Sequence, residues 1–113
     1  DHEVLDWICE LRAIYKTGLL SNIGRASIDK RFSEQELKAY FDAVVISGDI
    51  GMAKPDTAIY DYAAHQLQVQ PEECVFIDDR EGHCRGAESA GMHAIQFKSF
   101  TQAKTDLEKL LEK

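Results

Sequence analysis

A short apolar run that ends on two adjacent carboxylates constrains this chain more than any other stretch. Val75, Phe76 and Ile77 are typical of a buried strand, and Asp78 and Asp79 follow them directly. Parallel strands of an open α/β sheet end at a common edge, where such folds place their ligands. Adjacent carboxylates repel each other, so a bound cation is the simplest means of keeping both ionised. The run therefore predicts a strand that carries a candidate metal site to the carboxyl edge of a sheet.

Two other apolar runs end on polar residues in the same way. Residues 19–20 precede Ser21 and Asn22, and residues 44–46 precede Ser47 and lead on to Lys54. A hydroxyl and an amine at the same edge as two acids suit a phosphorylated ligand. The hydroxyl of Ser21 could bond a phosphoryl oxygen, and the alternative is a serine that ends a strand and caps the next turn.

Lys54 stands between a glycine-containing loop and Pro55, which is expected to open a helix. A lysine beside a helix amino terminus adds a full charge to the free amides there and favours an anion. Most lysines are ordinary surface residues, but Pro55 restricts the backbone of Lys54 and fixes its direction, which favours a functional role.

The acid pair and the histidine after it each allow two interpretations. Mg²⁺ in proteins takes one or two carboxylates together with waters and substrate phosphate, which suits Asp78 and Asp79. The alternative is that Asp79 caps the following helix. His83 is either a partner of these acids or a polar histidine on a helix face.

Helical and strand patterns alternate along the chain, with Ser33 and Glu36 spaced as a capping box. We expect residues 48–51 to form a loop in which Asp49 has no further role, and residues 71–73 to form a turn. Helices are expected over 1–15, 28–40, from Pro55 onward, over about 82–90 and around 107–111, and strands over 19–20, 43–47, 74–77 and 93–97. This order predicts a single α/β domain over residues 1–113 with a parallel sheet covered on both faces.

Charge and cysteine content exclude several classes of protein. Lys and Arg total 13 against 20 acids, and the net charge of −7 argues against binding nucleic acid or an anionic membrane surface. No apolar run approaches the roughly 20 residues that span a bilayer. Cys9, Cys74 and Cys84 show no metal-ligand spacing, which favours reduced thiols in a cytoplasmic protein.

The three runs together resemble the motifs of the haloacid dehalogenase-like hydrolase superfamily. Residues 19–22 look like its second motif, and residues 48–56 followed by Ile59 and Tyr60 look like its third. Residues 75–79, with Gly86–Ala87 and Ala90–Met92 after them, look like its fourth. A fourth motif with two carboxylates is closer to the magnesium-dependent phosphatases of the superfamily than to its metal-free dehalogenases.

This resemblance implies a three-layer Rossmann-like parallel sheet and a specific set of roles. Ser21 and Lys54 would act in catalysis and, with Asn22, bind a small phosphorylated metabolite. Apart from the resemblance, Arg25 stands just after these residues and could reach an anionic substrate, and the alternative is an exposed, solvated arginine. Asp79 would ligate Mg²⁺ directly, and Asp78 would be the second ligand or act through water. The reaction of the complete enzyme would be hydrolysis of a phosphate monoester through an aspartyl-phosphate.

The first motif of the superfamily, D-x-D-x-T/V, has no match between residues 1 and 113. The resemblance places it on a strand upstream of residue 1, in the middle of the sheet, followed by a helical cap. We therefore expect this chain to be a partial core domain that is inactive alone, because covalent phosphoryl transfer needs the missing carboxylate.

Without that strand, the strands at residues 19 and 74 would expose unpaired edges. We expect a poorly stable chain, self-association, or pairing with the missing segment.

Two other functions compete with this interpretation. A phosphate-binding or regulatory module without a nucleophile would keep the same clamp residues. A receiver-like phosphoacceptor domain also uses an acid pair, a hydroxyl and a lysine before proline, but its acid pair comes first in the chain, whereas here the pair comes last.

Overall fold

The computed structural model describes residues 2–111, in which helices and strands alternate. The elements are α1 (His2–Arg12), β1 (Gly18–Ser21), α2 (Arg25–Arg31), α3 (Glu34–Tyr40), β2 (Ala43–Ile46), α4 (Ser47–Ile50), α5 (Thr57–Gln66), the 3₁₀ turn η1 (Pro71–Glu73), β3 (Val75–Asp78), α6 (Glu81–Ser89), β4 (His93–Gln96) and α7 (Phe100–Leu111). Asp1, part of the first predicted helix, lies outside the described residues. Within this part of the chain, no helix is long and apolar enough to cross a membrane.

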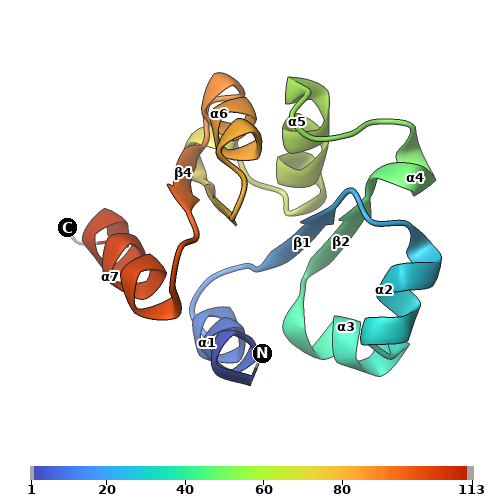
Figure 1. The fold of residues 1–113 in the computed structure, drawn as a ribbon, viewed down its shortest axis with the longest axis horizontal. Helices are drawn as coiled ribbons and strands as arrows, with labels where there is room; N and C mark the ends of the chain where they lie inside the picture. The colour runs from blue at the N-terminus through green and yellow to red at the C-terminus, as the bar shows by residue number, and fades with distance from the viewer. Residues whose placement is uncertain (1, 112–113) are drawn as a thin grey trace.

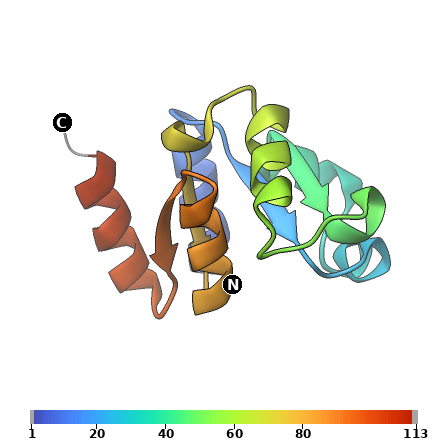
Figure 2. The same ribbon diagram turned by 90° about the horizontal axis from the view of Figure 1, so that it is seen from above.

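The strands form two parallel pairs that lie side by side. β1 pairs with β2, from Gly18 opposite Ala43 to Ser21 opposite Ile46. β3 pairs with β4 over residues 75–78 and 93–96. In Figures 1 and 2 the β1–β2 pair lies to the right and β4 to the left, and no strand of residues 2–111 joins the pairs. The predicted parallel α/β organisation is confirmed, and β1 and β3 each have a single strand partner among the described residues.

Helices cover the strands on both sides, which gives three layers. α5 and α6 lie on one side, and α1, α2, α3 and α7 on the other (Figure 1). The core under α5 and α6 includes Ile59 and Tyr60 of α5, Ala87 of α6 and Val45 of β2. Leu20 of β1 and Phe76 of β3 pack against this same core, so one apolar cluster joins the two strand pairs.

Helix α1 joins the two pairs on the opposite side. Its Trp7 is buried in a cluster with Ile95 of β4, and the Trp7 ring meets Phe100 of α7 edge-on at 5.6 Å between centroids. Its Ile8 packs against a second cluster that contains Ile46 of β2. Neighbouring positions of one helix therefore contact both halves of the molecule, and these contacts hold the halves together without backbone pairing between them.

Several predicted boundaries need correction. The single helix predicted over residues 28–40 is two helices, because Ser33 caps the second: its hydroxyl accepts from the amide of Glu36, and the Glu36 carboxylate accepts from the amide of Ser33. That capping box is confirmed. The loop predicted over residues 48–51 is wrong, since Ser47–Ile50 form a helical turn that ends at Gly51 with φ of +70°.

Tyr60 makes the unfolding free energy of this fold sensitive to alkaline pH. The Tyr60 side chain is fully buried, and its hydroxyl donates to the carbonyl of His83 at 2.6 Å. Burial, with repulsion from Asp78, raises the pKa of Tyr60 from 10.0 to about 12. The neutral phenol is therefore favoured more in the folded chain than in the unfolded one. Its stabilisation is present below pH 10 and is lost as pH rises toward 12, by up to about 3 kcal/mol.

Urea unfolding of the wild-type chain and of Tyr60→Phe between pH 8 and pH 11.5 tests this expectation. The variant lacks one buried hydrogen bond, so it should be less stable at pH 8 by about 1 kcal/mol. Above pH 10 its deficit should shrink, because only the wild type loses the Tyr60 contribution. Tyr15→Phe is the control, since Tyr15 is 45% exposed. A Tyr60→Phe deficit that stays constant across this pH range would contradict the assignment.

Candidate phosphate and metal site

Lys54 lies at the carboxyl ends of β1 and β3. Its Nζ is 2.8 Å from Oδ2 of Asp78 at the end of β3 and 3.2 Å from the carbonyl oxygen of Leu20 in β1. The Lys54 side chain is only 7% exposed and its Nζ lies 5.6 Å from the centroid of the Phe76 ring. An ammonium group in this position bridges the two strand pairs and places a positive charge between them. Lys54 therefore lies beside Asp78, and its predicted role in binding a phosphorylated ligand stays a prediction.

Asn22 fixes the backbone of Lys54. The side-chain amide of Asn22 donates to the carbonyl of Lys54 at 3.1 Å and accepts from its backbone amide at 3.0 Å. This two-point contact ties the loop after β1 to the segment before α5, where the Lys54–Pro55 peptide bond is cis. In this arrangement Asn22 positions Lys54, and its two polar side-chain atoms are used for that contact. Its predicted contact with a substrate stays a prediction.

Asp78 is the buried member of the acid pair, with a side chain that is 10% exposed. Its Oδ1 accepts from the backbone amide of Arg80 at 2.8 Å, and its Oδ2 contacts both Lys54 and Nδ1 of His83, the latter at 3.3 Å. Burial raises the pKa of the Asp78 carboxyl, but the bonds from Lys54, Arg80 and His83 outweigh burial and hold the pKa below its ordinary value. Asp78 is thus a carboxylate that orients Lys54, and His83 is a partner of that acid.

Asp79 is the exposed member of the pair. Its carboxylate makes no hydrogen bond or ion pair with the residues that the structure describes, and its backbone carbonyl accepts from the side chain of Gln96 at 3.1 Å. The alternative interpretation of Asp79 as a helix cap is wrong, because α6 begins after Arg80 and has no side-chain cap. The adjacent acids therefore differ: Asp78 faces inward to Lys54, and the Asp79 carboxylate has no protein partner among residues 2–111.

Ser21 ends β1 with a buried side chain that is 7% exposed. Its hydroxyl oxygen accepts from the backbone amide of Ile23 at 3.0 Å. This bond is the one expected of a serine that ends a strand and caps the next turn. An oxygen that accepts this bond still carries a proton to donate. The two interpretations of Ser21 are therefore compatible, and its predicted bond to a phosphoryl oxygen stays a prediction.

Arg25 and Asp49 form an ion pair near the same ends of β1 and β2. Oδ2 of Asp49 lies 2.6 Å from the guanidinium of Arg25, and both side chains are largely exposed. Arg25 begins α2 and Asp49 lies in α4, the helical turn that sequence reasoning took for a loop. A charge partner 24 residues away in sequence carries no local signal, so the pair could be found only from the fold.

The side chains available as metal ligands limit how a metal ion could be bound. Among residues 2–111, no group of three His, Cys, Asp or Glu side chains is placed to hold a metal. Mg²⁺ takes one or two protein carboxylates and completes its octahedron with water and phosphate oxygens. The unpaired oxygens of Asp79 fit that requirement, so this part of the chain can supply one side of a magnesium site, with further ligands from water or phosphate.

Comparison with known proteins agrees with these motifs. The sequence pattern of the haloacid dehalogenase-like hydrolases matches residues 2–91. Human N-acylneuraminate-9-phosphatase is 33% identical over 93 residues, which cover 81% of this chain and 38% of that enzyme. The chain spans well under two thirds of the length of such curated relatives.

Solved structures show the same fold. A predicted haloacid dehalogenase-like hydrolase from Porphyromonas gingivalis superposes with a TM-score of 0.82 at 31% identity, over 100% of this chain and 58% of that one. An enzyme of the family from Bacteroides thetaiotaomicron, in complex with magnesium and inorganic phosphate, gives a TM-score of 0.79 at 26% identity over 91% and 57% of the two chains. The chain belongs to the haloacid dehalogenase-like hydrolase family.

Proposed function

We propose that this chain supplies the phosphate clamp and one side of the magnesium site of a phosphatase that acts on a small phosphate monoester. The position of Lys54, whose buried ammonium is held between the carbonyl of Leu20 and the carboxylate of Asp78, carries this proposal. Asp78 pairs with the lysine and directs it, and the carboxylate of Asp79 beside it has no protein partner among residues 2–111. The similarity to a named phosphatase and to a family enzyme crystallised with magnesium and phosphate supports the same conclusion.

Each residue has a defined part in the proposed reaction. Lys54 offsets negative charge on the phosphoryl group and on the attacking carboxylate, and the Ser21 hydroxyl donates to a phosphoryl oxygen. Asp79 ligates Mg²⁺, and the bound ion supplies charge stabilisation to the phosphoryl oxygens. His83 and Asn22 hold Asp78 and Lys54 in place. The nucleophilic aspartate comes from a segment outside residues 1–113, so we propose that the chain alone does not turn over substrate.

We also propose that this segment enters as a strand between β1 and β3. Support comes from the strand pairing, since β1 and β3 have one partner each within residues 2–111. β3 supports it too: none of its four residues is fully buried, although helices lie on both faces of its strand pair (Figure 1). A parallel strand placed there would end beside Lys54, which is where an attacking carboxylate is needed. A second copy of this chain is the competing source of such a strand.

Hydrolysis of a generic aryl phosphate, measured with and without Mg²⁺, tests these proposals. We expect no turnover by the chain alone, and magnesium-dependent turnover once a D-x-D-bearing strand is fused before residue 1. Asp79→Asn in the fusion should lower turnover by about 100-fold or more, because several kcal/mol of charge stabilisation is lost. Asp61→Asn, at an exposed acid on α5, is the matched control.

The alternative function, a phosphate-binding or regulatory module without a nucleophile, gives a different result. If the protein is such a module, the chain alone would bind inorganic phosphate, and substitution of Lys54 would weaken that binding. The fusion would stay inactive. Turnover by the chain alone would show that a carboxylate within residues 1–113 attacks the phosphoryl group. Hydrogen exchange would report the strand directly, since the facing edges of β1 and β3 should gain protection in the fusion.

A further inference from the structure

The outer edge of β4 is open to other strands. The amides of His93 and Phe97 donate to the carbonyls of Cys74 and Asp78 beside β3, at 3.0 Å and 2.8 Å. Backbone groups alternate in direction along a strand, so Ala94 and Gln96 direct their N–H and C=O groups away from β3. No strand of residues 2–111 covers that side. Such an edge is a template for pairing with another chain, and folded proteins usually block it.

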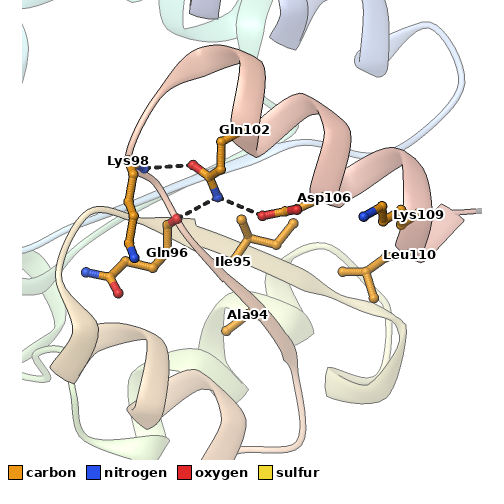
Figure 3. Close-up of a pocket in the computed structure, with 8 residues that line it drawn as sticks. All are labelled: Ala94, Ile95, Gln96, Lys98, Gln102, Asp106, Lys109 and Leu110. Carbon is orange, nitrogen blue, oxygen red and sulfur yellow. Dashed lines mark hydrogen bonds between the residues drawn. The ribbon is translucent and has the colours of Figure 1, made fainter.

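The side chain of Gln102, from the first turns of α7, covers part of this edge. Its Nε2 donates to the carbonyl of Gln96 at 3.0 Å, and its Oε1 accepts from the backbone amide of Lys98 at 2.9 Å (Figure 3). A side-chain amide carries the same donor and acceptor as a peptide group. Gln102 therefore occupies two outward backbone groups that an added strand would use, and it closes the carboxyl-terminal part of the edge.

A groove of about 570 Å³ runs beside the rest of the edge (Figure 3). Ala94, Lys98, Asp106, Lys109 and Leu110 contribute to its lining. Nε2 of Gln102 also donates to the carboxylate of Asp106, at 2.7 Å, and Leu110 is 45% exposed. The groove thus combines unpaired backbone groups, an exposed leucine and charges of both signs. None of the predicted site residues lines it.

We propose that Gln102 is a cap that holds the β4 edge closed against a second copy of this chain, and that β4 and α7 form a latent dimer interface. Antiparallel pairing of two β4 edges about a two-fold axis is self-complementary. Asp106 of one copy would face Lys98 and Lys109 of the other. Because the groove carries both signs of charge, two identical grooves can be complementary to each other. A uniformly acidic or basic partner would be repelled by one of the two signs. Pairing would also cover Leu110 in both copies.

Removal of the Gln102 side chain should free four groups at once: the carbonyl of Gln96, the amides of Lys98 and Ser99, and the carboxylate of Asp106. Gln102→Met keeps the length of the side chain and removes its polar atoms. We expect Gln102→Met to dimerise at least about tenfold more tightly than the wild type in analytical ultracentrifugation, since the freed carbonyl of Gln96 and amide of Lys98 can bond the partner strand. Gln35→Ala, at an exposed glutamine on α3, is the control and should behave as the wild type.

A second substitution tests whether the dimer forms through the edge of β4. Ala94→Pro removes only an outward-facing donor, which an edge strand tolerates. Combined with Gln102→Met it should return the dimerisation constant to the wild-type value. A second copy could also associate by adding a strand between β1 and β3, as described above. That association would not respond to Ala94→Pro, so this substitution distinguishes the β4 edge from the edges of β1 and β3.

Two results would overturn the proposal. One is a folded Gln102→Met chain that associates no more tightly than the wild type and Gln35→Ala. The other is tighter association that Ala94→Pro leaves unchanged. Circular dichroism of each variant establishes that it is folded, and Gln102→Ala replaces Gln102→Met if the longer side chain prevents folding.

Discussion

Lys54→Met is expected to lower the free energy of unfolding at pH 7 by about 3 kcal/mol, because it leaves the buried carboxylate of Asp78 without its cation. For a domain of this size, that corresponds to a fall in Tm of about 10 °C. Methionine is an unbranched apolar side chain of similar length, so the loss of charge and of two hydrogen bonds accounts for most of the change. Chemical and thermal unfolding followed by circular dichroism measures it.

The matched control is Lys38→Met. Lys38 also pairs with an acid, Glu34, but at 3.9 Å and with both side chains more than three-quarters exposed. Exposed helix pairs of this kind contribute about 0.3–0.5 kcal/mol. An equal loss in the two lysine variants would therefore contradict the view that burial makes the Lys54–Asp78 pair important.

The loss of unfolding free energy in Lys54→Met should depend on pH, because the pKa of Asp78 is lowered in the wild type. Stabilisation by a carboxyl whose folded pKa is lowered is present above the unfolded pKa and is lost as pH falls through the folded pKa. Without Lys54, burial dominates and the pKa of Asp78 should rise. The difference in unfolding free energy between wild type and variant should thus be largest near pH 7. It should begin to shrink as pH falls through the raised pKa of the variant and go on shrinking through the lowered pKa of the wild type. A deficit that grows in acid would refute this account.

Gly86→Ala is expected to have the second large effect. A Cβ on Gly86 would lie 2.4 Å from the backbone carbonyl oxygen of Pro55 and 2.8 Å from the hydroxyl oxygen of Tyr60. The Pro55 carbonyl belongs to the backbone and cannot rotate away, so α6 must move from the segment that carries Lys54. Overpacking of this kind costs about 1–3 kcal/mol, and we expect the upper end of that range because the closest atom is backbone.

Gly82→Ala is the control for Gly86→Ala, since both glycines lie in α6 and no atom of the described residues stands within 4 Å of a Cβ at Gly82. Alanine is the better helix former, so Gly82→Ala should be neutral or stabilise the chain by about 0.5–1 kcal/mol. Opposite signs in the two melting temperatures are the expected result. If Gly86→Ala melted at or above the wild-type temperature, the close approach of α6 to Pro55 would be wrong.

Some features of this protein could be read from the sequence because their signals are local. Apolar runs that end on polar residues located β1, β2 and β3, and the spacing of Ser33 and Glu36 gave the capping box. Parallel strands share one carboxyl edge, so Lys54 could be expected to lie near Asp78 before any coordinates were known. The motif order at that edge was enough to predict the family.

The remaining features depend on contacts between residues far apart in the chain. The two acids are neighbours with the same chemistry, and only the fold turns Asp78 toward Lys54 and His83. Within the part of the chain that the structure describes, it leaves the Asp79 carboxylate without a partner. The Arg25–Asp49 pair, the bond from Tyr60 to His83 and the contact of Gly86 with Pro55 likewise join separate elements. Local pattern predicts which residues form a strand or a helix, because backbone propensity and periodicity act over a few residues. Burial and pairing of a given carboxylate are set by the packing of the whole chain, so only the tertiary structure decided which acid holds the lysine.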